Sequence, residues 1–172
     1  MKIAYTMAPG RGDTDLLLSR VAETLATQGY ATCGTVQTNT ECASGPCDME
    51  VSILPDGPTL RISQDLGQAS KGCRLNPAAL ETAVGLVEAH LSPDSDLLII
   101  NKFGKHEAEG RGFRTVIASA LELEIPVLVG VNALNLAAFR DFVGPEAISL
   151  EPSEDLIREW LSTVLSRKNE VA

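Results

Sequence analysis

Basic residues and glycines gather in one segment of an otherwise acidic chain. Residues 101–114 read Asn-Lys-Phe-Gly-Lys-His-Glu-Ala-Glu-Gly-Arg-Gly-Phe-Arg and carry four of the 14 Lys and Arg residues against two acidic ones. The whole chain has a formal charge of −9. Glycines let backbone N–H groups approach a ligand, and basic side chains neutralise an anion. The segment therefore indicates a site for a phosphate or another oxyanion. The alternative is a solvated loop with scattered charges.

A second segment, residues 7–14, has the outline of a phosphate-binding loop. It reads Met-Ala-Pro-Gly-Arg-Gly-Asp-Thr, whereas a P-loop reads Gly-x4-Gly-Lys-Ser/Thr between a strand and a helix. Gly12 and Thr14 match, but Met7 replaces the first glycine and Asp13 replaces the lysine. The lysine of a P-loop attracts phosphate by about 4 kcal/mol, whereas Asp13 in its place would repel phosphate. The positive charge of Arg11 could partly compensate. The alternative is an ordinary turn with Asp13 as the helix N-cap.

The two segments supply the candidate ligand-binding residues. Backbone N–H groups of the first segment would meet the anion, and Lys102, Lys105 and Arg111 would supply charge. His106 could donate a proton or lie at the surface. Glu107 could act as a general base, bind magnesium or complement a helix N-terminus. The full candidate set is Pro9, Gly10, Arg11, Gly12, Asp13, Thr14, Lys102, Gly104, Lys105, Glu107, Arg111 and Asn132, with Arg61, Cys73, Arg74 and His106 as possible additions.

Apolar patterning predicts the elements that must position these residues. Buried strands are expected at residues 3–7, 30–37, 96–100, 125–131 and 147–150, and helices begin near residues 13, 77, 113, 136 and 153. The first helix should bury Leu16, Leu17, Val21, Leu25 and Ala26. Alternating strands and helices predict a doubly wound, mostly parallel α/β sheet of P-loop NTPase type, with a β-hairpin inserted at about residues 47–64. Ligands bind such sheets at the carboxyl edge, where residues 8–13, 101–112 and 132–135 should lie.

Composition limits the class of protein. With 172 residues and 44% hydrophobic residues, one domain covering residues 1–172 is expected. The acidic balance argues against nucleic-acid binding and against an anionic membrane surface. No apolar run approaches the roughly 20 residues that span a bilayer, and the first residues do not form a signal peptide. A cytoplasmic protein is therefore expected.

Four cysteines are expected as thiols in that compartment. Cys33 falls within an expected strand and is predicted to lie in the core. Cys42, Cys47 and Cys73 could gather around zinc, but their spacing is borderline and a fourth ligand is not evident. A sharper alternative places Cys47 and Cys73 beside the ligand site, and the simplest places small thiols in a hairpin packed at the sheet edge.

The two loops together resemble those of the small thermophilic-type nucleoside triphosphatases, which have a kinase-like P-loop fold. The shared pattern is Pro9-Gly10-x-Gly12 followed, after the strand at 96–100, by Gly104-Lys105-x-Glu107. The second motif of that family reads Asp-Glu-Ile-Gly-Lys-Met-Glu. Asn101 stands in place of its magnesium-binding aspartate, and Lys102 in place of its glutamate. The resemblance implies a retained fold and anion cradle in which hydrolysis is impaired.

Nearly the whole chain is also similar to a bacterial family catalogued as a domain of unknown function. This family is associated with molybdenum-uptake genes, which implies an oxyanion such as molybdate as the ligand class. The motifs that carry the resemblance are Gln37-Thr38-Asn39-Thr40, Cys47-Asp48-Met49, Arg61-Ile62-Ser63-Gln64-Asp65-Leu66-Gly67, Gly72-Cys73-Arg74-Leu75, residues 101–113 and Gly130-Val131-Asn132.

Three functions follow as expectations. The first is a degenerate P-loop protein that binds a phosphate-type oxyanion, either molybdate or tungstate or the phosphate of ATP or ADP with magnesium, as an accessory to molybdenum handling. The second is a magnesium-dependent nucleoside triphosphatase that uses Thr14 and Glu107. The third is a non-catalytic regulator or subunit in metal-cofactor supply, whose partner is a second copy of the chain or a protein of the molybdenum pathway.

Overall fold

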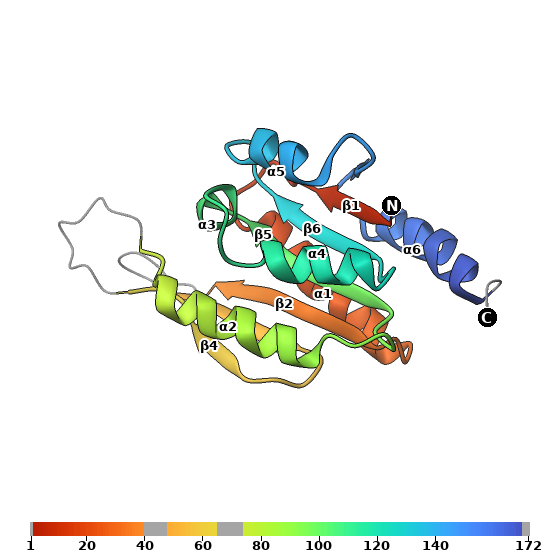
Figure 1. Ribbon diagram of the computed structural model, residues 1–172, viewed down its shortest axis with the longest axis horizontal. Coiled ribbons are helices and arrows are strands. Elements are labelled where there is room, and N and C mark those ends of the chain that lie inside the picture. Colours follow the sequence, from red (N-terminus) through yellow and green to blue (C-terminus); the bar gives the residue numbers. More distant parts are fainter. Residues whose placement is uncertain (1, 40–47, 65–73, 170–172) are drawn as a thin grey trace.

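A seven-stranded sheet forms the centre of the protein, in the order β4-β3-β2-β5-β6-β1-β7. The computed structural model describes residues 2–39, 48–64 and 74–169 (Figure 1). The pairs that β2, β5, β6, β1 and β7 form in this order are parallel, and β3 and β4 add an antiparallel hairpin beyond β2. This confirms the predicted α/β class. The strands are β1 (Ile3–Thr6), β2 (Thr32–Asn39), β3 (Met49–Leu54), β4 (Thr59–Arg61), β5 (Leu97–Phe103), β6 (Val127–Val131) and β7 (Ile148–Leu150).

Helices cover both faces of the sheet. They are α1 (Asp13–Thr27), α2 (Pro77–His90), α3 (Lys105–Ala108), α4 (Arg114–Glu122), α5 (Leu136–Val143) and α6 (Glu154–Asn169). One apolar core joins α1 and α6 to the sheet, and the other joins α2, α4 and α5 to its opposite face. Figure 1 shows α2 and α4 in front of the sheet, with α1 behind it. Among the described helices, none has both the length and the apolar composition needed to span a bilayer.

The first helix differs from expectation in its cap and in its buried face. Gly12, with φ of 84°, occupies the N-cap position, and no side chain among the described residues caps the helix, so the expected Asp13 cap is wrong. Leu16 is 60% exposed, and Leu18, which is fully buried, takes its place in the core. A helix that packs on a flat sheet buries positions i, i+3, i+4 and i+7, and here this series begins at residue 14 or 15. Position 16 therefore faces solvent.

The first part of the expected loop 101–112 is also more regular than predicted. Strand β5 continues to Phe103 instead of ending at residue 100, and Lys105 then begins the short helix α3. Asn101 and Phe103 are buried at the end of this strand. A polar residue was expected to mark the loop, whereas Asn101 is a buried strand residue that has a side-chain partner on α1.

Candidate functional site at the carboxyl edge of the sheet

Three loops lie at one edge of the sheet, as the sequence predicts. The strands β5, β6 and β1 are adjacent and parallel, so the segments that follow them share the carboxyl edge. The arrows of β1, β2 and β6 point to the left in Figure 1, where α3 also lies. This edge is where α/β sheets bind ligands.

The loop after β1 closes on itself through Thr14. The backbone N–H of Ala8 donates to Thr14 Oγ1 over 2.9 Å, and Leu16 N donates to Gly12 O over 3.0 Å as the helix begins. Asp13 is exposed, and its carboxylate lies against Gly10, where an added Cβ would be 2.1 Å from Asp13 Oδ2. The loop therefore keeps the strand–turn–helix form of an anion-binding loop, with a carboxylate packed beside it.

Behind this loop, α1 and β5 are joined by a buried polar cluster. Asp15 is 3% exposed and Asn101 is 2% exposed. Asn101 Nδ2 donates to Asp15 Oδ1 over 2.8 Å, and Lys102 Nζ lies 3.6 Å from the same oxygen. Lys102 keeps about 43% of its side chain exposed, so it reaches from the sheet edge to the first turn of α1. The structure thus brings Lys102 to the first turn of α1, which directly follows the loop that lacks the usual lysine.

An irregularity in β5 makes this cluster possible. Successive side chains of a regular strand point to opposite faces, so Asn101 and Lys102 could not both face α1. The pairing of β5 with β6 shifts register between Ile100 and Phe103, which interrupts the alternation. Gly130 on β6 accommodates the shift, because a Cβ there would lie 2.1 Å from the carbonyl oxygen of Asn101.

Glu107 organises the rest of the basic segment. It is 3% exposed, and its carboxylate accepts the N–H groups of Gly104 (2.9 Å) and Phe113 (3.3 Å). Burial raises the pKa of Glu107, and these backbone N–H groups partly oppose that effect. Gly112, with φ of 62°, comes so close that a Cβ would lie 2.1 Å from Glu107 Oε1. These contacts make Glu107 a structural residue of the loop.

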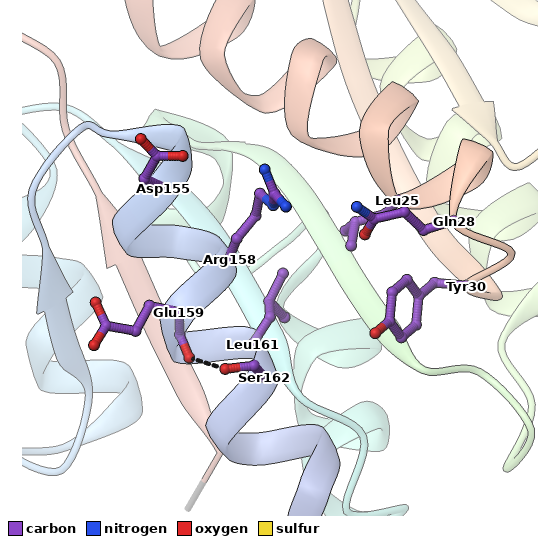
Figure 2. Close-up of a pocket in the computed structure, with 8 residues that line it drawn as sticks. All are labelled: Leu25, Gln28, Tyr30, Asp155, Arg158, Glu159, Leu161 and Ser162. Carbon is purple, nitrogen blue, oxygen red and sulfur yellow. Dashed lines mark hydrogen bonds between the residues drawn. The ribbon is translucent and has the colours of Figure 1, made fainter.

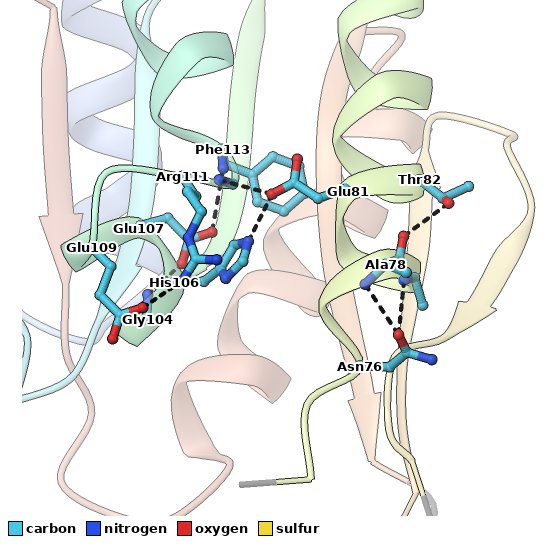
Figure 3. Close-up of polar contacts among 12 residues, drawn as sticks. Asn76, Ala78, Glu81, Thr82, Gly104, His106, Glu107, Glu109, Arg111 and Phe113 are labelled. Atoms are coloured by element: carbon cyan, nitrogen blue, oxygen red, sulfur yellow. Dashed lines mark hydrogen bonds and ion pairs between the residues drawn. The ribbon is translucent and has the colours of Figure 1, made fainter.

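The other polar side chains of this segment either turn toward α2 or pair within the segment. His106 Nε2 lies 2.7 Å from Glu81 Oε1, and Gly112 N donates to the same oxygen over 3.2 Å (Figure 3). Lys105 and Arg111 both pair with Glu109, at 3.6 and 2.6 Å. His106 and Arg111 line a hollow of about 440 Å³ beside the start of α2. Because α2 and α1 cover opposite faces of the sheet, the segment that looked like one site is divided between two faces.

The remaining predicted residues lie elsewhere on the same edge or outside the described residues. Arg61 and Arg74 approach one carboxylate oxygen of Asp48, at 2.8 and 3.6 Å, near the end of β2. Asn132 Oδ1 accepts the N–H of Asn135 over 3.0 Å and shapes the loop after β6. Cys33 is buried, as predicted. Cys42, Cys47 and Cys73 lie outside the described residues, so the zinc alternative stays a prediction.

A separate hollow lies at the other end of α1. Figure 2 shows it between Leu25, Gln28 and Tyr30 on one side and α6 on the other, with a volume of about 390 Å³. Helix α1 runs back from the carboxyl edge, so its last turn lies at the amino edge of the sheet. Arg158 there is accompanied by Asp155 and Glu159, which gives this hollow no charge preference for an anion.

Most of the chain matches a described protein family. Residues 3–160 match the family described as "Protein of unknown function (DUF2478)". The chain belongs to this family. It is also 34% identical over 167 residues to "Molybdenum import ATP-binding protein ModC 2" of Bradyrhizobium diazoefficiens. That match covers 96% of the chain and 19% of the relative, so the chain spans about a fifth of the relative's length.

Two solved structures share the fold of this DUF2478 chain. The crystal structure of THEP1 from Aquifex aeolicus superposes with a TM-score of 0.62 at 18% identity, over 96% of the chain and 98% of THEP1. The solution structure of a human cancer-related nucleoside triphosphatase gives 0.63 at 14% identity, over 100% of both chains. These likenesses confirm the predicted P-loop NTPase type of fold.

Sequence reasoning missed two residues of the edge. Asp15 is not among the predicted residues, although it precedes Leu18 and Ala22 at the helical spacing of a buried face. That spacing is the signal that could have found it. Glu81 lies on an exposed part of α2, and nothing in its sequence neighbourhood indicates a contact with His106 25 positions away.

Proposed function

We propose that the protein binds a phosphate-type oxyanion in a cradle formed by residues 8–14 and Lys102, as an accessory to molybdenum handling. The anion is molybdate, tungstate or the phosphate group of a nucleotide. The observation that carries the proposal is the 3.6 Å approach of Lys102 Nζ to Asp15 Oδ1, because it places a rim cation at the first turn of α1. A helix N-terminus and a lysine together favour an anion more than either does alone.

The charges around the cradle favour binding over nucleotide hydrolysis. Arg11 and Lys102 are offset by Asp13 and Asp15, so the formal charge of these four side chains is zero. A P-loop NTPase places its lysine on the β- and γ-phosphates and stabilises the charge that develops there. With Asp13 in that position, stabilisation of a triphosphate transition state is weak. Backbone N–H groups together with Lys102 and Arg11 still suit a compact oxyanion.

The ModC-named relative supports molybdate as the oxyanion. A segment 34% identical to this chain forms part of a protein named for molybdenum import and ATP binding. Molybdate and tungstate are tetrahedral oxyanions like phosphate, so a phosphate cradle provides suitable donors for them. The proposed accessory role rests on this relative and on the chemistry of the cradle together.

Titration calorimetry with molybdate, tungstate, phosphate, ADP and ATP tests the proposal. Binding of at least one of these anions is expected, and Lys102→Met should raise its Kd at least about tenfold through the loss of a charge-assisted contact. Lys105→Met removes the same charge from the same segment, but Lys105 pairs with Glu109, so a much smaller effect is expected. No heat with any of the anions would overturn the proposal.

A second candidate function is a magnesium-dependent nucleoside triphosphatase. Asn101 Oδ1 is buried and has no hydrogen-bond partner among the described residues. Asn101 is bonded to Asp15, and Asn101 and Thr14 both lie against Gly130. Hydroxyl, amide and carboxylate oxygens are suitable magnesium ligands, so these three residues fit that ion chemically. The described residues contain no cluster of three or more His, Cys, Asp or Glu side chains that could hold a metal. Magnesium-dependent phosphate release that is lost in Thr14→Ala would establish this function.

A further inference from the structure

The cation of the cradle is already paired with an anion that belongs to the fold. Lys102 Nζ lies 3.6 Å from Asp15 Oδ1, and the Asp15 carboxylate is nearly fully buried. No loop of the P-loop type needs a carboxylate directly after its Ser or Thr, because the motif ends there. The P-loop-like pattern of residues 7–14 therefore does not account for the carboxylate of Asp15.

The side chains of Asp15 and Lys102 differ in conformational freedom. Asp15 belongs to the first turn of a 15-residue helix, and Asn101 Nδ2 holds its carboxylate over 2.8 Å. Lys102 has a flexible stem and is 43% exposed. If the pair separates, Lys102 moves and Asp15 stays. Any anion that enters the cradle must then compete with Asp15 for Lys102.

We propose that Asp15 is an internal competitor that sets the ligand specificity of the cradle, and that Lys102 exchanges Asp15 for the bound oxyanion. This inference rests on the proposed oxyanion-binding function. A ligand with one negative charge gives Lys102 no more than Asp15 already provides, and it leaves Asp15 without its ammonium partner. A tetrahedral dianion offers twice the charge. The cradle should therefore select dianionic oxyanions and reject monoanions of the same shape.

A double-mutant cycle separates this role from simple repulsion. Asp15→Asn keeps a side-chain oxygen for Asn101 Nδ2 but releases Lys102, so the Kd for tungstate should fall about tenfold. If Asp15 acts through Lys102, the gain disappears when Asp15→Asn is made in a Lys102→Met background. If Asp15 only repels the ligand, the same gain persists in that background. Asp56→Asn removes an equal charge from the exposed turn between β3 and β4 and should leave the Kd unchanged.

Perrhenate tests the charge threshold, since it has the tetrahedral shape of tungstate with one negative charge fewer. In the unaltered protein, perrhenate should not displace tungstate at concentrations where tungstate saturates the site. In Asp15→Asn it should become a measurable competitor. A crystal of the unaltered protein with tungstate gives a test that does not depend on the folding of a variant. Anomalous scattering locates the tungsten atom. Lys102 Nζ is expected to contact a tungstate oxygen and to have moved away from Asp15.

The outcomes distinguish this inference from the function on which it rests. Tungstate binding that is equal in the unaltered protein and in Asp15→Asn, a gain that survives Lys102→Met, or a tungstate complex with the Lys102–Asp15 pair intact would each overturn the inference alone. Absence of heat with every anion and every variant would overturn both.

Discussion

Asn101 Nδ2, at the end of β5, donates a 2.8 Å hydrogen bond to Asp15 Oδ1 in the first turn of α1. A carboxylate only accepts hydrogen bonds, so this contact fixes the orientation of the Asn101 amide. Its Oδ1 is then directed away from Asp15 and has no hydrogen-bond partner within the part of the chain that the structure describes. Asn101, which stands where the similar triphosphatase family has its magnesium-binding aspartate, is thus a hydrogen-bond donor to Asp15. The effects of substitutions at these two positions are therefore expected to be coupled.

Restoring an aspartate at this position should therefore destabilise the protein. Asn101→Asp places a second buried carboxylate against Asp15, and we expect a loss of about 3 kcal/mol in the free energy of unfolding at pH 7.5. Urea denaturation followed by circular dichroism measures it. Asn76→Asp adds the same charge at the N-cap of α2, where Asn76 Oδ1 accepts two backbone N–H groups, and should cost little. Equal losses in both variants would contradict the prediction.

The hydroxyl of Thr14 should matter for the loop and for its ligand. Thr14→Ala removes the acceptor of Ala8 N–H, with an expected loss of about 1 kcal/mol in unfolding free energy and a several-fold higher Kd for tungstate. Thr14→Ser retains the hydroxyl and should keep most of both. Calorimetry and urea denaturation provide the two readings, and indistinguishable Ala and Ser variants would show that the hydroxyl has no such role.

The architecture was predictable because its signals are local. The apolar runs at residues 97–100 and 127–131 are buried on both faces, as a parallel sheet requires. Asn76 and Pro77 begin α2 as their types predict. Both signals lie within a few neighbouring residues.

The composition of the site was less predictable, because it depends on contacts between distant residues. The apolar pattern of the sequence does not predict the irregularity in β5 that turns both Asn101 and Lys102 toward Asp15. Asp15 is also 86 positions from Asn101 in sequence. The same holds for His106 and Arg111, which the sequence groups with Lys102 and the fold places beside α2. A glycine-rich basic segment shows that an edge loop is present, but only the packing of α1 and α2 decides which side chain faces which layer.

The contribution of Glu107 to the free energy of unfolding should fall as pH rises, whereas that of an ion-paired surface carboxylate rises. Burial raises its pKa above the ordinary 4.5, so the folded state holds the proton more tightly than the unfolded state. Stability from this group is therefore present at low pH and is lost as pH rises through the raised folded value. Glu107→Gln keeps one acceptor oxygen for the N–H groups of Gly104 and Phe113 and places an NH2 donor against the other. It should therefore be less stable than the unaltered protein near pH 4, and the difference should shrink as pH rises to 7.5, where the buried carboxylate of Glu107 has lost its pH-dependent stabilisation.

Glu109 provides the matched control for this measurement. A hydrogen bond from Arg111 lowers its pKa, so its contribution is present at neutral pH and is lost as pH falls. Glu109→Gln should thus be slightly less stable at pH 7.5 and equal at low pH, the reverse of Glu107→Gln. Urea denaturation across pH 4 to 7.5 tests both, and parallel curves for Glu107→Gln and the unaltered protein would contradict the prediction.

Gly34 in β2 should tolerate no side chain. Its φ is +114°, and an added Cβ would lie 1.9 Å from the carbonyl oxygen of Ile99 on β5, so neither backbone can yield without disturbing the centre of the sheet. We expect Gly34→Ala to lose at least about 3 kcal/mol in unfolding free energy through backbone strain and overpacking. Gly85→Ala is the matched control, because nothing lies within 4 Å of an added Cβ there. It should gain about 0.5–1 kcal/mol from helix propensity in α2. Urea midpoints that shift in the same direction for both variants would contradict the close approach of β2 and β5 on which the prediction rests.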